Sequence, residues 1–236
     1  MDFGDIATRG LVLLGCGKMG GAMLAGWLEN GLSPDAVHVI DPKPSDWLKT
    51  TGVHVNEALP EAPAMTLLAV KPQMMGDALP AVVALSGKTV FLSIAAGTTI
   101  ATLRAALGPD AAIIRAMPNT PAAVGRGITA LIGDTQVGAA DLDLAETLLS
   151  AVGQVVRFED EVQMDAVTAV SGSGPAYVFH LIECLAQAGE AEGLSPDLAM
   201  ALAKATVGGA GVLAEEADET PSELRVNVTS PNGTTQ

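Results

Sequence analysis

Cysteine, aromatic residues and basic residues are all scarce in this chain, and each scarcity excludes something. Two cysteines among 236 residues cannot build a disulfide framework, which favours a reducing compartment. A chain of this length buries a sizeable core without disulfides or a structural metal, as one large domain or two modest ones. Aromatic residues make up only 3% of the sequence, a composition that favours close helix–sheet packing over stacking surfaces.

Basic side chains are few and are not clustered. Twelve Lys and Arg stand against 27 Asp and Glu, which gives a formal charge of −15 and a pI of about 4.3. A nucleic-acid groove needs clustered positive charge, so no nucleic-acid partner is expected. Residues 159–236 hold two basic and thirteen acidic side chains, as is typical of a solvated helix surface.

The sequence also has no obvious targeting segment. No basic stretch precedes an uninterrupted apolar run at the N-terminus, so no secretory signal is expected. No apolar run reaches the 18 or so residues of a membrane span. We therefore expect a soluble, cytoplasmic protein with no membrane partner.

Residues 10–158 alternate short apolar runs with helical stretches. Continuous apolar runs separated by helices are typical of parallel strands buried on both faces. This pattern predicts an α/β domain with a doubly wound, Rossmann-type parallel sheet. Strands are expected at 10–14, 37–40, 65–70, 89–94, 112–116, 128–132 and 154–158, and helices at 18–30 and 141–151.

After residue 158 only helical periodicity continues. Helices are expected over 162–170 and 175–192, and then from Ser195-Pro196, an N-cap followed by proline, to about 216. A short helix follows Thr220. The expected domains are therefore residues 1–158 and an all-α domain of residues 159–236. The final Ser-Pro-Asn-Gly-Thr-Thr segment looks like the opening of another helix, so we expect the natural chain to continue beyond Gln236.

A glycine-rich turn joins the first expected strand to the first expected helix. Gly15, Gly17 and Gly20 form the pattern G-x-G-x-x-G, which includes Lys18 and Met19. The first glycine permits a tight turn, the second lets a pyrophosphate approach the backbone, and the third lets the helix pack closely against the strand. The phosphates would lie on free N–H groups at the helix N-terminus. The pattern predicts dinucleotide binding; the alternative is a purely structural turn.

Asp41 ends the second expected strand, where an acid accepts hydrogen bonds from the adenine ribose and repels a 2′-phosphate. This favours NADH. Lys43 and Ser45 follow at once and both suit a phosphate, so NADPH stays open. A strand-end turn without a ligand is the structural alternative.

Four further segments carry a family resemblance in their order and spacing. They are Ala69-Val70-Lys71-Pro72-Gln73, Arg115-Ala116-Met117-Pro118-Asn119-Thr120-Pro121, Ser171-Gly172-Ser173-Gly174-Pro175-Ala176-Tyr177 and Val228-Thr229-Ser230-Pro231-Asn232-Gly233-Thr234-Thr235. From Gly10 onward the chain resembles pyrroline-5-carboxylate reductase, with Asn232-Gly233 where the family usually has Gly-Gly. The resemblance implies reduction of the cyclic imine 1-pyrroline-5-carboxylate to L-proline by hydride from NADPH or NADH, the last step of proline biosynthesis. It also implies that the helical domain forms a homodimer or a larger homo-oligomer.

The resemblance implies specific site residues. Thr235 would lie beside the imine nitrogen and orient it or relay a proton, since threonine is a poor acid. Uncharged donors would hold the substrate carboxylate, namely Ser230, Gly233, Thr234 and Thr235, with Glu161 and Asn227 nearby. Besides the glycine-rich turn and Asp41, the dinucleotide would contact Asn56, Ala69, Val70, Lys71, Pro72, Ala95, Ala96 and Pro118.

Several of these positions also have a structural explanation. The segment from Ser230 to Gly233 is typical of a turn and helix cap, and Glu161 of a first-turn helix acid. Lys71 also suits the exposed end of a strand. The small residues from Ser171 to Gly174 suit a close helix crossing.

Two other functions share this architecture. A β-hydroxyacid dehydrogenase carries a catalytic lysine on the first long helix of its helical domain, but no Lys or Arg occurs between Arg157 and Lys204. A non-catalytic dinucleotide sensor would have no need of a carboxylate cradle.

The remaining reactive side chains do not point to a metal or a nucleophile. His38, His54 and His180 are not spaced as metal ligands on one element, and Cys16 and Cys184 have no evident catalytic partner. No metal is expected.

Overall fold

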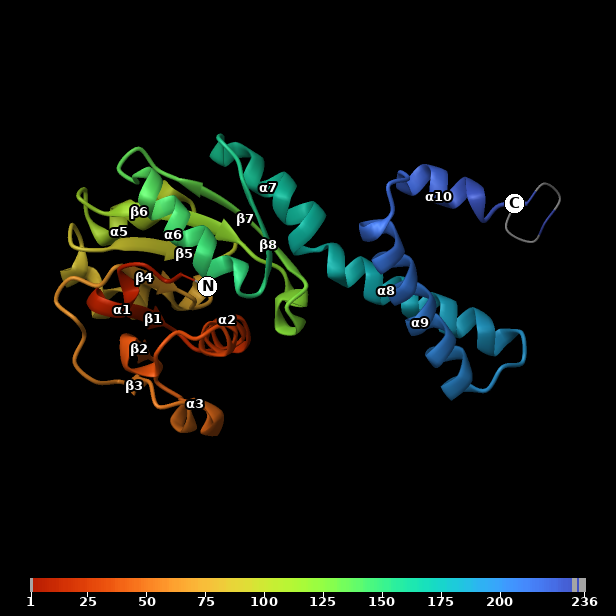
Figure 1. Ribbon diagram of the computed structural model, residues 1–236, viewed down its shortest axis with the longest axis horizontal. Helices are drawn as coiled ribbons and strands as arrows, with labels where there is room; N and C mark the ends of the chain where they lie inside the picture. The colour runs from red at the N-terminus through yellow and green to blue at the C-terminus, as the bar shows by residue number, and fades with distance from the viewer. Residues whose placement is uncertain (1, 231–232, 234–236) are drawn as a thin grey trace. The chain divides into compact units, whose positions relative to one another are not determined.

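The computed structural model describes residues 2–230 and residue 233. Contacts between residues divide the chain into two compact units, Met1–Ser173 and Gly174–Gln236 (Figure 1). The two units are described separately below.

An eight-stranded sheet forms the centre of the first unit (Figure 1). The strand order is β3-β2-β1-β4-β5-β6-β7-β8, and every neighbouring pair is parallel except β6–β7. The doubly wound fold predicted from the sequence is confirmed. The strands are β1 (Leu11–Leu14), β2 (Val37–Ile40), β3 (His54–Val55), β4 (Met65–Leu68), β5 (Val90–Ser93), β6 (Ala112–Met117), β7 (Gly127–Gly133) and β8 (Gly153–Arg157).

The antiparallel β6–β7 pair corrects the expectation of a wholly parallel sheet. Only residues 118–126 connect the two strands, and a parallel crossover needs a dozen or more residues. The connection contains a short 3₁₀ segment, Thr120–Val124. This segment ends at Gly125, which adopts the left-handed conformation with a φ of 69°. The apolar pattern of β7 was read correctly, but a burial pattern alone does not give strand direction.

Helices cover both faces of this sheet. They are α1 (Ile6–Arg9), α2 (Lys18–Glu29), α3 (Asp46–Thr50), α4 (Met75–Ala78), α5 (Ile100–Leu107), α6 (Ala139–Ser150) and α7 (Met164–Val167), which continues as a π-helical turn, Thr168–Gly172. Strand β1 shows the two-sided burial. Its residues Leu11 and Leu13 pack in the core under α2 and α6, whereas Val12 and Leu14 pack in the core on the α4 and α5 side.

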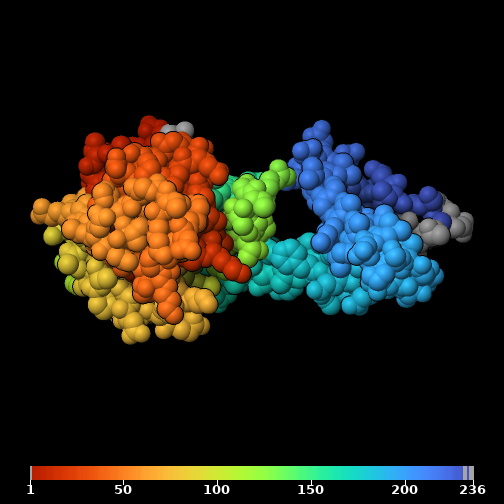
Figure 2. Space-filling view, turned by 90° about the horizontal axis from the view of Figure 1, so that it is seen from below, coloured from red at the N-terminus to blue at the C-terminus, as the bar shows by residue number. Residues whose placement is uncertain are grey.

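Close packing holds α2 to its neighbours. The fully buried Trp27 donates from Nε1 to the carbonyl oxygen of Leu148 on α6 at 2.8 Å. In the space-filling view, differently coloured segments of the first unit lie side by side on its surface (Figure 2). The loops at the carboxyl ends of the strands are attached to this packed core.

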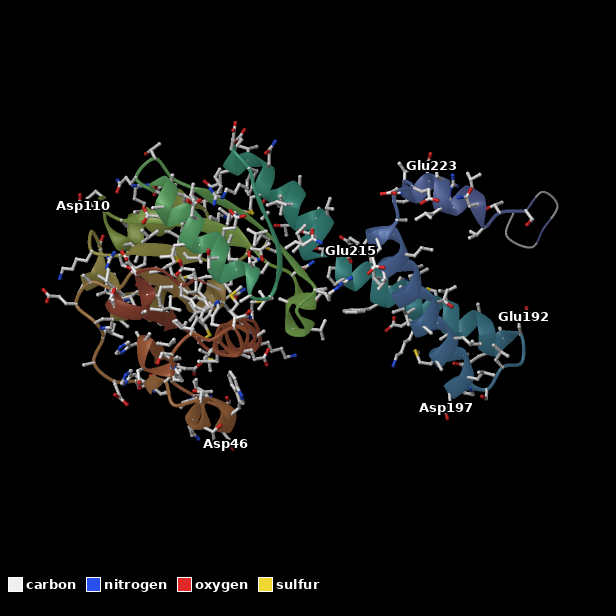
Figure 3. All side chains as sticks on the ribbon, in the orientation of Figure 1. Asp46, Asp110, Glu192, Asp197, Glu215 and Glu223 are labelled. Carbon is white, nitrogen blue, oxygen red and sulfur yellow. The ribbon has the colours of Figure 1, made fainter. Side chains whose placement is uncertain are left out.

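The second unit contains α8 (Gly174–Ala191), α9 (Pro196–Glu216) and α10 (Pro221–Asn227). Ser195 and Thr220 cap α9 and α10 as the sequence predicted, since their hydroxyl oxygens accept from the N–H groups of Leu198 and Glu223. Acidic side chains of this unit are exposed, among them the labelled Glu192, Asp197 and Glu223 (Figure 3).

The core of the second unit is small. Among its described residues, only Ala186, Ala199 and Ala203 form a buried apolar cluster, with Ile182 and Met200 packed against them. By length and composition alone, α9 is the one helix among the described residues that would span a membrane, with 21 residues. Uninterrupted apolar runs did not reveal this, because Lys204 divides the helix.

Residues 161–172 pack with the first unit although they are helical. Met164 is 1% exposed, and Glu161 bonds to groups on α5 and β6. The contacts therefore change between residues 173 and 174, whereas the sequence suggested a boundary at 158/159, where the strand pattern ends.

Candidate functional site

The glycine-rich turn after β1 has a backbone that only glycine fits. Gly15 has a φ of 91°, and a Cβ there would lie 2.8 Å from Cγ1 of Val70. A Cβ at Gly20 would collide with the carbonyl oxygen of Gly15. These two glycines bring α2 against the ends of β1 and β4, as the sequence pattern predicted.

Gly17 differs from its two neighbours in the motif. It is the N-cap of α2, and nothing lies within 4 Å of the position where its Cβ would stand. The space is therefore open on the ligand side, at the positive end of a twelve-residue helix whose first N–H groups have no helical partner. A pyrophosphate fits this cradle.

Three cavities lie along this edge of the sheet. The first, of about 640 Å³, is lined by Cys16, Gly17, Lys18, Gly21, Ala25, Asp41, Lys43, Ser45 and Trp47. The second, of about 390 Å³, is lined by Leu14, Ile40, Pro42, Asn56, Val70, Met74, Asp77, Ala78 and Ala81. The third, of about 220 Å³, is lined by Met19, Ala69, Val70, Lys71, Pro72, Ile94, Ala95, Ala96, Met117 and Pro118.

The structure brings together the cofactor residues named from the sequence. Every one of them except Gly15 and Gly20, which lie beneath the turn, lines one of the three cavities. Val70 lines two of them, at the junction of the second and third. An extended dinucleotide has room along this edge, with its phosphates over Gly17.

The Asp41 carboxylate accepts hydrogen bonds from two turns, the glycine-rich turn after β1 and the turn that follows β2. Its Oδ2 accepts from the N–H of Cys16 and its Oδ1 from the N–H of Lys43, each at 2.8 Å. Asn56, in the left-handed region at a φ of 55°, bonds through its side chain to the N–H and the carbonyl oxygen of Asp41. Asp41 thus fixes the glycine-rich turn in addition to facing the first cavity.

Sequence reasoning missed part of the lining. Trp47 lies on α3 beside the first cavity and is 44% exposed. Met74, Ala78 and Ala81 come from the helical turns that follow Pro72 and form an apolar wall of the second cavity. An exposed tryptophan in a chain poor in aromatics, close behind Asp41, was the available signal for the first of these.

Cys16 lies inside the glycine-rich turn, and burial together with the negative charge of Asp41 raises the pKa of its thiol to about 11. We expect it to be unreactive. At pH 8, in a Cys184→Ser background, its rate with a disulfide reagent should be about 100-fold below that of a free thiol of pKa 9, because only the thiolate reacts. The measurement is the absorbance of the released thiolate.

The control is Asp41→Asn, which removes the charge and should speed the reaction of Cys16. A native Cys16 that reacts as fast as glutathione at pH 8 would contradict this description of the turn.

Glu161 is engaged within the first unit. Its Oε1 accepts from Nη1 of Arg115 at 2.7 Å and from the N–H of Ile100 at 2.8 Å. The Arg115 side chain is 5% exposed, so this ion pair is largely buried. Glu161 does lie in a first helical turn, the structural alternative from the sequence, but its partners are distant in sequence rather than local.

The substrate residues expected near the C-terminus lie in the second unit. Asn227 is the last residue of α10, and Ser230 follows it. The N–H of Gly233 donates to the carbonyl oxygen of Ser230 at 2.8 Å, so it is used within a tight turn. A Cβ at Gly233 would lie 3.0 Å from Ser230, which explains glycine there. Thr234 and Thr235 lie outside the described residues.

The other ionisable residues form no metal site. Within residues 2–230 and 233, no three His, Cys, Asp or Glu side chains are grouped to hold a metal ion. His38 and His54 instead stack with their ring centroids 4.5 Å apart on neighbouring strands at the sheet edge.

Comparisons with known proteins place the chain in a family. Residues 161–236 match the family described as pyrroline-5-carboxylate reductase dimerisation, and residues 10–97 match NADP oxidoreductase coenzyme F420-dependent. A pyrroline-5-carboxylate reductase of Pseudomonas aeruginosa is 40% identical over 98% of this chain and 87% of its own. One of Synechocystis is 41% identical over 95% and 86%.

Solved structures agree with the sequences. A pyrroline-5-carboxylate reductase from Coxiella burnetii matches with a TM-score of 0.89 and 34% identity, over 97% of this chain and 87% of its own. The Plasmodium falciparum pyrroline carboxylate reductase with NADP bound matches with a TM-score of 0.85 and 28% identity over the same shares. From its sequence and its fold together, the chain belongs to the pyrroline-5-carboxylate reductase family.

Proposed function

We propose that this protein reduces 1-pyrroline-5-carboxylate to L-proline with hydride from NADPH or NADH. The observation that carries the proposal is the open backbone at Gly17, at the head of α2, with the three cavities beside it. Family membership supplies the substrate, since the related enzymes carry its name.

Each part of the chain has a task in this reaction. A bound reduced nicotinamide supplies the hydride. The glycine-rich turn binds the phosphates. The apolar side chains that line the third cavity keep water from the reacting ring; they are Ala95, Ala96, Met117 and Pro118. Apart from Lys71, the lining of this cavity is apolar and suits a planar ring.

Both cofactors are compatible with the first cavity. Asp41 already accepts two backbone N–H groups, which partly offsets its charge, and Lys18, Lys43 and Ser45 line the same space. We propose that these residues let the enzyme use NADPH as well as NADH. The ratio of kcat/KM for the two cofactors should shift toward NADPH in Asp41→Ala, because the remaining carboxylate charge disfavours a 2′-phosphate.

The substrate site proposed at the C-terminus uses uncharged donors. Ser230, Gly233, Thr234 and Thr235 would hold the ring carboxylate and the imine nitrogen, with Asn227 close by. Gly233 would have to release its bond to Ser230 if its N–H is to bind the carboxylate.

Thr235→Ala tests the role of the hydroxyl. It should lower kcat/KM on the order of tenfold, the worth of one orienting hydrogen bond, and leave the Kd of the dinucleotide near normal. Steady-state kinetics and fluorescence titration of the cofactor are the measurements. Equal loss of turnover and of cofactor affinity would contradict the assigned role.

We propose a homodimer or larger homo-oligomer built through α8 and α9. Large apolar side chains on these helices stand exposed in the single chain, namely Tyr177, Phe179, Leu181, Leu185, Leu198, Leu202 and Leu213. Association would bury them, which also explains the apolar character of α9 without a membrane. With two free cysteines and biosynthetic relatives, a cytoplasmic location is proposed.

Turnover decides the function. Purified protein mixed with NADPH or NADH should lose absorbance at 340 nm only when pyrroline-5-carboxylate is added, and proline should form in equal amount. Dinucleotide binding without turnover of any cyclic imine would favour a sensor instead.

A further inference from the structure

Two walls of the third cavity come from neighbouring strand ends, and Met19 and residues 69–72, which follow β4, form the rest of its lining. The β5 wall consists of Ile94, Ala95 and Ala96, in the loop between β5 and α5, and the β6 wall consists of Met117 and Pro118, at the end of β6. Both walls come from carboxyl ends of strands in the sheet. Their positions, together with the end of β4, shape the space available to a flat ring.

Both walls are tied to one helical segment, residues 161–172, which we call the brace. Glu161 begins it. This carboxylate accepts from the N–H of Ile100, the first residue of α5, and from Arg115, two residues before the β6 wall. One oxygen atom, Oε1, therefore links the start of α5, which follows the β5 wall, to the strand β6, which ends in the β6 wall.

Asn119 ties the other end of the brace to the β6 wall. It directly follows Pro118 and is 9% exposed. Its Oδ1 accepts from the N–H of Ile128 at 3.0 Å, and its Nδ2 donates to the carbonyl oxygen of Ser171 at 3.2 Å. The amide thus joins three segments: the wall, the start of β7 and the brace.

Sequence explains why Ser171 offers its carbonyl oxygen. In an α-helix that oxygen accepts from the N–H four residues later, but residue 175 is proline and has none. Asn119 supplies the missing donor. At the next residue, a Cβ on Gly172 would lie 2.5 Å from Cε of Met117, so glycine lets the brace lie directly against the β6 wall.

We propose that Asn119 and Glu161 are positioning residues, which fix the two walls at the separation that the nicotinamide ring needs. Neither residue lines the cavity, so both act through the walls. The proposal depends on the proposed function in one respect, which is that the nicotinamide binds in the third cavity. A ring held loosely between shifted walls would present its hydride at a poor distance and angle.

The first test uses Asn119→Asp, which keeps an acceptor for Ile128 but puts a carboxylate oxygen where Ser171 needs a donor. We expect kcat to fall about tenfold and the Kd of the reduced dinucleotide to rise several-fold. The Kd of ADP-ribose, or of its 2′-phosphate, should stay within about twofold of the unsubstituted value, because this fragment lacks the nicotinamide. Fluorescence and calorimetric titrations give these constants.

The matched control is Ser171→Ala. Its hydroxyl donates to the carbonyl oxygen of Val167, and its own carbonyl oxygen, which Asn119 binds, is retained. This variant should keep the unsubstituted kcat and both dissociation constants. Loss of kcat here comparable to that in Asn119→Asp would overturn the assignment to the Asn119 amide.

Glu161→Gln is the second variant, because it keeps an acceptor for Ile100 and removes only the charge that pairs with Arg115. It should show the same selective loss, with ADP-ribose binding unchanged. Unchanged kcat and Kd values in both variants, or equal loss of reduced dinucleotide and ADP-ribose, would overturn the proposal. Absence of imine turnover in the unsubstituted enzyme would instead refute the proposed function, while the two binding titrations would still test the walls.

Discussion

The Gly17→Ala variant should fold with only a small loss of stability and lose dinucleotide binding. No atom of the chain lies within 4 Å of the added Cβ, so the methyl group meets only the space where the pyrophosphate belongs. A steric conflict of about 2–3 kcal/mol raises the Kd about 100-fold. The temperature of thermal unfolding without ligand should fall by only about 2–4 °C, because alanine is a poorer N-cap than glycine by about 1 kcal/mol.

Two glycine variants frame this result. Gly20→Ala should lose binding and also about 1–3 kcal/mol of unfolding free energy, because its Cβ collides with the carbonyl oxygen of Gly15. Gly76→Ala, in the exposed part of α4 with open space around it, should keep both properties. If Gly17→Ala binds the dinucleotide at the unsubstituted Kd, the phosphates do not lie on this turn.

The glycine-rich turn was predictable because its physics is local. Gly15, Gly17 and Gly20 need only a strand before them and a helix after them, and both can be read from apolar runs over a few residues. The carboxyl ends of β4 and β5 then fall at the same edge, because parallel strands share their direction. This is why residues far apart in sequence could be assigned to one site.

Asp41 shows where such reasoning ends. Its position after β2 suggested a ribose acceptor, but its carboxylate also accepts the N–H groups of Cys16 and Lys43. Those bonds depend on the path of two turns, which no periodicity encodes. The same holds for Glu161, whose partners Ile100 and Arg115 are 61 and 46 residues away in sequence.

The brace was predicted as helical, and the pattern assigned it to the second domain, as the dimerisation family match from residue 161 also does, whereas its contacts lie with the first unit. Strands end at residue 157, so a change from strand to helix periodicity suggested a new domain there. Burial of Met164 instead keeps these turns on the first unit. Periodicity reports the local conformation of a segment, whereas its neighbours are decided by contacts between distant residues.

The second large effect concerns association. Leu202→Glu should dissociate the oligomer at micromolar concentration and lower kcat/KM sharply. Leu202 is 50% exposed in the single chain, so a carboxylate there costs the isolated helical unit little. In a twofold interface each substitution appears twice; burial of the exposed half of each leucine is worth about 0.8–1.5 kcal/mol, and burying two unpaired carboxylates adds to the loss. The combined loss, about 3 kcal/mol or more, raises the dimer Kd more than about 100-fold.

The fall in activity follows from the small core of the helical unit. Among the described residues of this unit only three alanines are buried, and α10, which ends at Asn227, follows these helices. Without a partner to cover α8 and α9, little would hold α10 and Asn227 in place. Light scattering coupled to size exclusion, together with steady-state kinetics at several protein concentrations, measures both consequences.

Val83→Glu provides the matched control, because Val83 is an exposed apolar residue of the first unit, 37% exposed and outside the three cavities. It adds the same charge and should leave mass and kinetics unchanged. An oligomer that persists in Leu202→Glu would show that the interface does not include the face of α9 that carries Leu202, against the proposal. If the activity lost in Leu202→Glu returns at higher protein concentration, catalysis depends on association, because mass action favours the oligomer at higher concentration.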